Sequence, residues 1–174
     1  MFKASINCSV KRFISIGSCF EYDLFTKKRL DVNSDLKPLT PYAVAKVETF
    51  KTLTKLFSNL DAEFLWARMF YLFGEREDPR RLIPMLRKNL REKKKVSLTE
   101  GYEVRDYLNI NEAGEIISNL SFSNVQGAFN VCSGKEVTIR EIAEKIAEEY
   151  DALDLLEFGT YNMNTCLLYT SDAA

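Results

Sequence analysis

The feature that most limits the fold is one long helical pattern between two short apolar runs. Residues 12–17 (Arg-Phe-Ile-Ser-Ile-Gly) and 63–70 (Glu-Phe-Leu-Trp-Ala-Arg-Met-Phe) are rich in β-branched and aromatic side chains, which predicts two buried strands. Between them, apolar residues recur at the helical steps of three and four, at Ala43, Val47, Phe50, Leu53, Phe57 and Leu60.

The same alternation continues along the chain. Thr40 and Pro41 suit the N-cap and first position of the long helix, and Thr138 with Glu141 forms a capping-box pattern for a helix that ends near Tyr150. Further helices are predicted over 82–90 and 111–120, with strands over 96–98, 104–107 and 128–132. Strands that alternate with helices predict an α/β fold with a mainly parallel sheet.

The amino-acid composition argues against several classes of function for this chain. Over 174 residues, 24 Lys and Arg nearly balance 25 Asp and Glu, so the net charge of -1 leaves no electrostatic footprint for nucleic acid. There is no apolar run of roughly 18 residues and no apolar signal-peptide core, so we predict a cytoplasmic protein without membrane partners. Histidine is absent, and the cysteines have neither metal nor disulfide spacing, at Cys8, Cys19, Cys132 and Cys166. We predict free thiols and no metal site.

One pair of polar residues near the start of the long helix has the spacing for proton transfer. Tyr42 and Lys46 are four residues apart, so both side chains lie on one helix face. A free phenol loses its proton only near about pH 10, but a neighbouring ammonium stabilises the phenolate, and the pair can then exchange a proton with a carbonyl or alcohol oxygen. Ser18, after the first strand, adds a hydroxyl that can hold the same oxygen. Taken alone, the spacing fits a surface tyrosine and a solvated lysine as well.

Five short motifs in a fixed order favour the catalytic interpretation. They are residues 12–22 (Arg-Phe-Ile-Ser-Ile-Gly-Ser-Cys-Phe-Glu-Tyr), 41–46 (Pro-Tyr-Ala-Val-Ala-Lys), 68–74 (Arg-Met-Phe-Tyr-Leu-Phe-Gly), 105–108 (Arg-Asp-Tyr-Leu) and 129–134 (Phe-Asn-Val-Cys-Ser-Gly). Together they resemble the extended short-chain dehydrogenases/reductases, in the NAD-dependent epimerase/dehydratase branch that acts on sugar nucleotides. The resemblance implies the C-terminal half of a Rossmann-like doubly wound parallel sheet over residues 1–74 and a small α/β substrate-binding domain, mainly over residues 75–165.

The resemblance implies a role for each matching residue of the first part. Tyr42 would be the acid/base on the sugar hydroxyl or keto group, and Lys46 would support it and hydrogen-bond the nicotinamide ribose. Ser18 would orient the reacting oxygen of the substrate. The backbone around Met69 and Phe70 would approach the nicotinamide of the cofactor, NAD or NADP.

Two further positions are implied to contact the nucleotide-sugar substrate. Arg105 would pair with the nucleotide diphosphate, since a guanidinium fork suits phosphate oxygens; the alternative is a salt bridge with Asp106 or a neighbouring acid. Tyr71 stands where many relatives have an Asn that contacts the substrate phosphate. Donation to phosphate and a buried packing role stay equally open for Tyr71.

Departures from the family motifs narrow the implied reaction. Cys19 and Phe20 stand where 4,6-dehydratases have the Asp and Glu that eliminate water, which disfavours a dehydratase. Cys19 lies three residues before Tyr22 rather than two, and histidine is absent, which disfavours epimerisation of the GDP-fucose-synthase kind. Residues 74–84 and 155–159 most resemble reductases of the CDP-abequose-synthase kind. Reduction of a 4-keto-6-deoxy sugar nucleotide is therefore favoured over C4 epimerisation, and both over a non-catalytic relative that binds a nucleotide or partner.

The family's Gly-rich phosphate-binding turn does not occur among the seven glycines. We therefore expect an N-terminally truncated fragment that lacks the first cofactor-binding half and is inactive alone. Residues 166–174 (Cys-Leu-Leu-Tyr-Thr-Ser-Asp-Ala-Ala) have no periodicity and are expected to be an adapter-derived artefact. A homodimer through the helices that include the Tyr42 helix is implied by the resemblance alone.

Overall fold

The chain folds into two compact units. The computed structural model describes residues 10–26 and 28–161, and the expected artefact tail, residues 166–174, lies outside them. The first unit takes the residues up to Phe70 together with Asn111–Cys132, and the second takes Tyr71–Ile110 and the residues from Ser133 on. The predicted division at residue 74 placed residues 111–132 in the second part. In the structure these residues belong to the first unit, because the strand that they contain pairs with the sheet of that unit.

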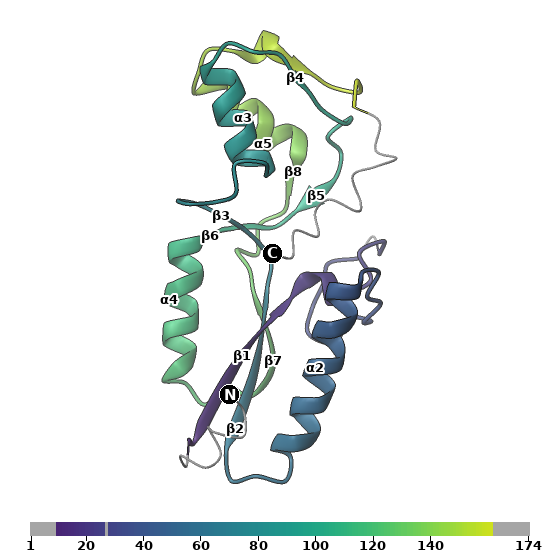
Figure 1. Cartoon of the computed structure of the whole chain (residues 1–174), viewed down its shortest axis with the longest axis vertical. Coiled ribbons are helices and arrows are strands. Elements are labelled where there is room, and N and C mark those ends of the chain that lie inside the picture. The colour runs from purple at the N-terminus through teal and green to yellow at the C-terminus, as the bar shows by residue number, and fades with distance from the viewer. Residues whose placement is uncertain (1–9, 27, 162–174) are drawn as a thin grey trace. The chain divides into compact units, whose positions relative to one another are not determined.

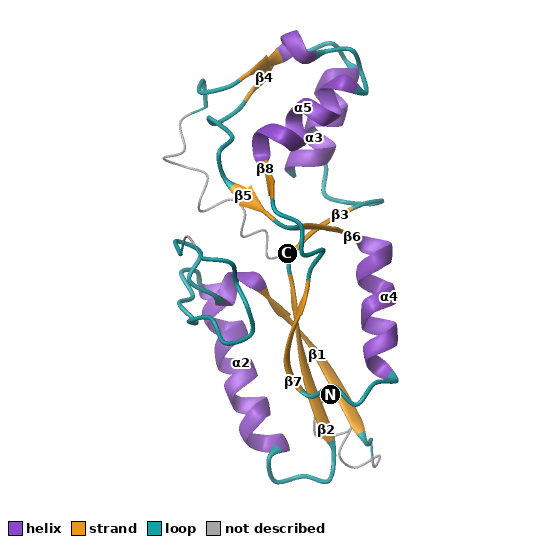
Figure 2. Cartoon of the chain, turned by 180° about the vertical axis from the view of Figure 1, so that it is seen from behind, coloured by secondary structure: helices purple, strands orange, loops and turns teal. Residues whose placement is uncertain are grey.

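The first unit is a three-stranded parallel sheet with a helix on each face. The central strand β2 (Glu63–Met69) pairs with β1 (Arg12–Ser18) on one side and β7 (Gly127–Val131) on the other. The helices α2 (Pro41–Phe57) and α4 (Ile110–Ser121) lie on opposite sides of this sheet (Figure 1), and the rear view shows the same arrangement (Figure 2). The predicted parallel sheet is confirmed in this unit.

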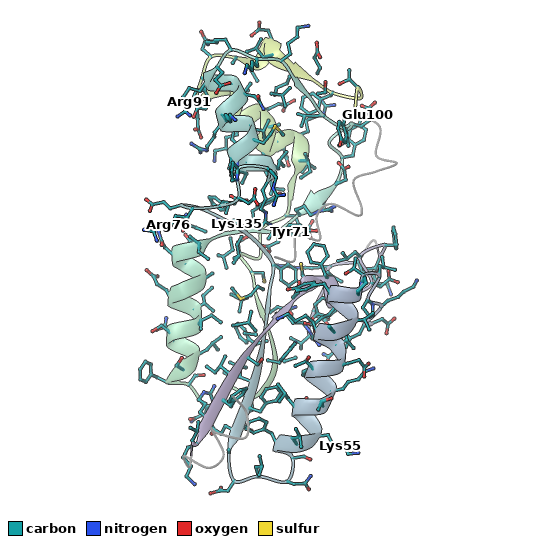
Figure 3. All side chains as sticks on the ribbon, viewed as in Figure 1. Lys55, Tyr71, Arg76, Arg91, Glu100 and Lys135 are labelled. Carbon is teal, nitrogen blue, oxygen red and sulfur yellow. The ribbon has the colours of Figure 1, made fainter. Side chains whose placement is uncertain are left out.

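The helix α2 begins and packs as its sequence predicts. The Thr40 hydroxyl accepts a hydrogen bond from the Ala43 amide at 3.1 Å, which caps the helix start. Four residues of the predicted apolar stripe are buried, namely Ala43, Val47, Leu53 and Phe57. Phe57 stacks on Phe64 of β2 with ring centroids 5.0 Å apart. Lys55 lies on the outer side of the last turn (Figure 3), where a cation favours the helix C-terminus.

The second unit is built from two helices and pairs of very short strands. α3 (Leu82–Arg91) packs on α5 (Ile139–Glu148), which starts at the predicted Thr138 capping box. Two strand pairs are parallel, β3 (Tyr71–Phe73) with β6 (Tyr107–Asn109) and β4 (Val96–Ser97) with β9 (Leu156–Glu157). The third, β5 (Val104–Arg105) with β8 (Val137–Thr138), is antiparallel.

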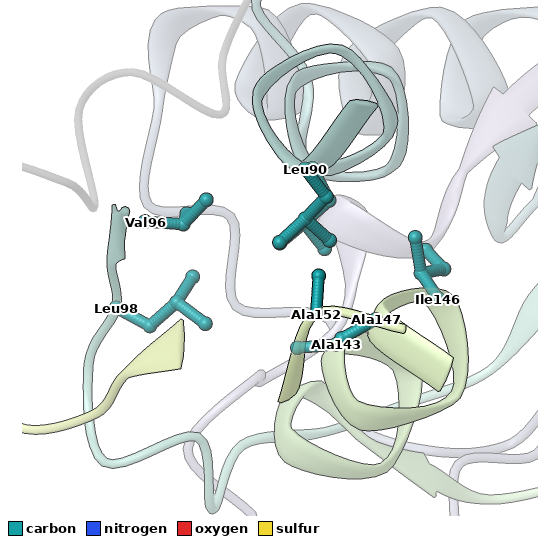
Figure 4. Close-up of a cluster of buried hydrophobic side chains, with 8 residues drawn as sticks. Leu90, Val96, Leu98, Ala143, Ile146, Ala147 and Ala152 are labelled. Atoms are coloured by element: carbon teal, nitrogen blue, oxygen red, sulfur yellow. The ribbon is translucent and has the colours of Figure 1, made fainter. Parts of the chain in front are cut away.

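The core of the second unit lies between its helices and β4. Figure 4 shows the buried side chains that meet there, which are Leu86, Leu90, Val96, Leu98, Ala143, Ile146, Ala147 and Ala152. The small alanines of α5 allow the leucines of α3 to approach closely. Among the described residues, no helix is long and apolar enough to cross a bilayer.

Leu90→Ala is expected to lower the free energy of unfolding of the second unit by about 2–5 kcal/mol, because it leaves a cavity at a fully buried position. Hydrogen exchange of the α3 and α5 amides measures this loss within the unit. Leu153→Ala is the matched control, since Leu153 is 50% exposed and its truncation should change the free energy by less than about 0.5 kcal/mol. Equal effects of the two substitutions would contradict this packing.

Candidate active site

The predicted site residues of the first unit gather at the carboxyl edge of its sheet. Ser18 ends β1 and is in register with Met69 of β2, which is in register with Val131 of β7. Phe70 follows, and its amide donates to the Val131 carbonyl at 3.1 Å. Parallel α/β sheets bind ligands at this edge. The structure thus aligns two residues predicted for different roles, Ser18 for substrate and Met69 for cofactor.

Tyr42 and Lys46 lie together on the first turns of α2. The Lys46 Nζ atom is 5.7 Å from the centre of the Tyr42 ring, which confirms the predicted shared helix face. The same Nζ donates to the backbone carbonyl of Ile16 at 2.8 Å. This bond ties the helix to β1 two residues before Ser18. Both side chains are only partly buried, so solvent or a substrate can reach them.

Ser18 is held in a short turn at the end of β1. It caps the 3₁₀ turn η1 (Cys19–Glu21), and its hydroxyl oxygen accepts from the Phe20 amide at 3.3 Å. Its own amide donates to Oε1 of Glu21 at 2.7 Å. In this geometry the Ser18 oxygen serves as acceptor within the protein, and its O–H proton remains for a further acceptor such as a substrate oxygen.

A buried ion pair adjoins Ser18; both of its residues lie within the quoted motifs, but no role was predicted for either of them. The side chains of Glu21 and Arg68 are 0% and 1% exposed, and Oε2 of Glu21 lies 2.7 Å from Nε of Arg68. The indole nitrogen of Trp66 lies 3.0 Å from both oxygens of Glu21. The signal in the sequence was an arginine inside an apolar strand, because fully buried charges need partners.

The pair extends into a network that reaches β7 and α2. Nη1 of Arg68 donates to the Tyr22 hydroxyl at 2.9 Å, which donates to Oδ1 of Asn130 at 2.7 Å. Burial raises the pKa of Tyr22, and the Arg68 charge offsets part of that rise, so the phenol keeps its proton near neutral pH. The guanidinium carbon of Arg68 lies 4.7 Å from the Tyr22 ring centre and 4.9 Å from that of Phe50 on α2.

The structure also brings together the two predicted residues of the second unit. The guanidinium carbon of Arg105 lies 5.2 Å from the centre of the Tyr71 ring, and Tyr71 packs against Tyr107 at 5.5 Å. The predicted alternative partner, Asp106, instead accepts from the amides of Ser133 and Gly134, each at 2.7 Å. Arg105 is therefore held by an aromatic face and by a hydrogen bond from its Nη1 to the Val104 carbonyl at 2.8 Å, and its further N–H donors are suited to phosphate.

A buried carboxylate in the same unit lacks one partner. Glu77 follows the left-handed residue Arg76 (φ 63°) in the loop after β3 (Figure 3), and its side chain is 8% exposed. One of its oxygens lies 3.4 Å from Nε of Arg81, while Oε2 has no hydrogen-bond partner among the described residues. Burial raises the pKa of Glu77, against the opposing charge of Arg81 and a backbone hydrogen bond from Gly74. Across residues 10–26 and 28–161, no group of three or more Cys, Asp or Glu side chains is arranged to hold a metal ion.

Comparison with known proteins identifies the family. The model of the NAD dependent epimerase/dehydratase family matches residues 1–132. The chain belongs to this family. The resemblance deduced from its five motifs is thereby confirmed, and so is the α/β fold with a parallel sheet.

Several family members are similar to the chain over most of its length. The probable GDP-L-fucose synthase 1 of Oryza sativa subsp. japonica is 28% identical over 163 residues, covering 83% of this chain and 49% of that protein. The dTDP-6-deoxy-L-talose 4-dehydrogenase (NAD(+)) of Aggregatibacter actinomycetemcomitans is 25% identical over 147 residues, covering 82% and 53%. The solved UDP-N-acetylglucosamine 4-epimerase of Methanobrevibacter ruminantium M1, in complex with UDP-N-acetylmuramic acid, superposes with a TM-score of 0.83 at 23% identity, covering 90% and 52%. The chain spans about half the length of these relatives.

Position 17 requires a glycine, because the side chains of Trp66 and Glu21 lie very close to its backbone. A Cβ at Gly17 would lie 2.2 Å from the indole nitrogen of Trp66 and 2.5 Å from Oε1 of Glu21. Gly17→Ala should therefore lower the free energy of unfolding by about 1–3 kcal/mol. Gly114→Ala in α4 is the control: its Cβ meets nothing within 4 Å, so it should raise the free energy by about 0.5–1 kcal/mol. Urea unfolding measures both changes, and effects of the same sign would contradict the geometry.

The raised pKa of Glu77 predicts a pH dependence of stability. Because the folded state binds this proton more tightly, the wild type should gain stability relative to Glu77→Gln as the pH falls from about 7 toward the ordinary value of 4.5. Asp78→Asn should show the opposite sign, since the Arg80 hydrogen bond lowers the pKa of Asp78 to about 2. There the wild type loses stability relative to the variant between the ordinary value of 3.8 and about 2. Urea unfolding across pH tests both, and parallel trends would contradict the buried setting of Glu77.

Proposed function

We propose that the chain supplies the proton-transfer half of an enzyme that moves a hydride at one carbon of a nucleotide sugar, with NAD or NADP as cofactor. The observation that carries this proposal is the placing of Tyr42 and Lys46 on the helix tied to β1, next to the edge where Ser18 ends that strand. Membership of the NAD-dependent epimerase/dehydratase family supports it. The reaction that we favour is reduction of a 4-keto-6-deoxy sugar nucleotide.

The side chains divide the proton chemistry between them. When bound, the reduced cofactor supplies the hydride that adds to the carbonyl carbon. Tyr42 donates its proton to the ketone oxygen as that oxygen gains negative charge, which turns the ketone into an alcohol. The Ser18 hydroxyl holds the same oxygen through the proton that its capping contact leaves available. Lys46 stabilises the Tyr42 phenolate until solvent returns the proton.

This chain carries groups for only one end of the cofactor. Lys46 is suited to the nicotinamide ribose, and the backbone at Met69 and Phe70 lies at the sheet edge where the nicotinamide ring would approach. None of the seven glycines forms a Gly-rich turn for the pyrophosphate. We propose that a segment outside this chain supplies that contact, consistent with the half-length match to the relatives.

In the second unit, Arg105 is the group that we propose for the substrate diphosphate. Its guanidinium lies on the face of Tyr71 and its Nη1 donates to the Val104 carbonyl, which orients the group, and its further N–H donors would bind phosphate oxygens. Tyr71 thereby packs in the structure and supports the phosphate contact indirectly. This assignment follows the family resemblance at residues 105–108.

The choice of reductase rests on the sequence and on one relative. The Aggregatibacter relative is, by its name, a 4-dehydrogenase of a 6-deoxy sugar nucleotide. A mechanism of the GDP-fucose-synthase kind needs a histidine, and this chain has none. C4 epimerisation is the alternative, because oxidation and re-reduction at one carbon need only the same three side chains, Ser18, Tyr42 and Lys46.

Tyr42→Phe is expected to reduce kcat by about 10²–10⁴-fold in the full-length protein, because it removes the transferable proton. Binding of NADP(H), followed by fluorescence titration, should stay within about threefold of the wild type, since the ring and its packing remain. Tyr102→Phe is the matched control, as Tyr102 is exposed in the second unit and should leave kcat unchanged. Near-wild-type turnover by the Tyr42→Phe protein would refute the catalytic role.

Cofactor stoichiometry separates the candidate reactions. With a 4-keto-6-deoxy sugar nucleotide, a reductase oxidises one NAD(P)H for each sugar reduced. An epimerase interconverts two sugar nucleotides without net cofactor change. Binding of both ligands without turnover of either substrate class would favour a non-catalytic relative.

A further inference from the structure

We infer that Glu21 is a positioning residue, which aims the Ser18 hydroxyl and couples it, through Arg68, to the helix that carries Tyr42 and Lys46. This inference rests on the proposed function, and it adds residues that none of the family motifs assigns to the reaction. Its basis is the fully buried network between the end of β1, the strand β2 and α2.

Glu21 fixes the backbone from which the Ser18 side chain projects. Its Oε1 accepts the Ser18 amide while the Ser18 hydroxyl oxygen accepts from within the same turn, which closes a reciprocal capping box. Because both ends of the three-residue turn are bonded, the Ser18 side-chain oxygen is held in one position. Ser18 is only 6% exposed and Glu21 is fully buried, so water competes little for the bond between the Ser18 amide and the Glu21 carboxylate.

Arg68 links this turn to the catalytic helix. Its Nε holds the second oxygen of Glu21, and its guanidinium plane is packed against Phe50 of α2 and against Tyr22. Phe50 lies one helical turn after Lys46, on the same helix as Tyr42. A shift of the ion pair would therefore move Ser18 relative to the proton-transfer pair.

The network needs a carboxylate at position 21. All the contacts to Glu21 come from donors, namely the amide of Ser18, the indole of Trp66 and the guanidinium of Arg68. A glutamine would turn an NH₂ group toward at least one of these donors. The substitution Glu21→Gln therefore keeps the shape of the side chain while disturbing its direction and that of Ser18.

A double-mutant cycle in the full-length protein tests the inference. Glu21→Gln is expected to lower kcat at least about tenfold while the KM for the nucleotide sugar changes less than about threefold. In a Ser18→Ala background, the same Glu21→Gln substitution should lower kcat by less than about threefold, because the group that it positions is already absent. All assays are run well below the unfolding midpoint of each variant.

Two further variants distinguish a loss of positioning from a loss of folding. Arg68→Lys keeps the positive charge but loses the Tyr22 bond and the planar stacking, so it should show the same background-dependent loss of kcat if Glu21→Gln does not fold. Glu63→Gln is the matched control, since it breaks the Arg12–Glu63 ion pair that joins the other ends of β1 and β2. It should lower stability and leave kcat unchanged.

Each outcome bears on a separate claim. Equal fold losses of kcat in the wild-type and Ser18→Ala backgrounds would overturn the positioning role and leave the proposed reaction standing. Absence of turnover in the wild-type full-length protein, with every 4-keto or 4-hydroxy nucleotide sugar tried, would overturn the proposed function and the positioning role together.

Discussion

The buried ion pair between Glu21 and Arg68 is the interaction on which the first unit depends. Removing one partner of such a pair leaves an uncompensated charge and costs about 3–5 kcal/mol. Here the cost would not stay local, because the same network bonds the indole of Trp66 and, through Tyr22, Asn130 on β7. The three strands and α2 are therefore held in one arrangement by polar contacts as well as by apolar packing.

This arrangement explains why the site can be assembled from elements far apart in the sequence. Parallel pairing places the strand ends at one edge, so Ser18 and Met69 are neighbours although 51 positions separate them in the numbering. The crossover helix returns from that edge, which puts Tyr42 and Lys46 on its first turns. The chemistry of the site is local to the helix start, but its geometry is a property of the sheet.

Most of the helices and strands that carry the candidate site could be predicted from the sequence, because helix caps and apolar spacing are local, periodic patterns. The helix cap at Thr40 and the apolar stripe of α2 depend on spacings within a few turns. The network around Glu21 could not be predicted, since its members come from separate elements and only the fold brings them together. In the second unit, strands were predicted where β4 and β5 lie, but their two-residue partners β9 and β8 are too short to show periodicity. The antiparallel pairing of β5 with β8 also departs from the mainly parallel sheet that was predicted.

Two buried glutamates, Glu21 and Glu77, differ in how many hydrogen-bond donors surround their carboxylates. The oxygens of Glu21 are both bonded by donors from the backbone, an indole and a guanidinium, so its charge serves to hold a fixed geometry. Glu77 has an arginine near one oxygen and a backbone hydrogen bond from Gly74, but its Oε2 has no hydrogen-bond partner among the described residues, and burial raises its pKa. A fully hydrogen-bonded buried carboxylate holds its donors in a fixed geometry, whereas the raised pKa of Glu77 makes the stability of its loop depend on pH. The fully bonded carboxylate of Glu21 lies in the first unit, beside the residues proposed for proton transfer, and the carboxylate with the raised pKa lies in the second.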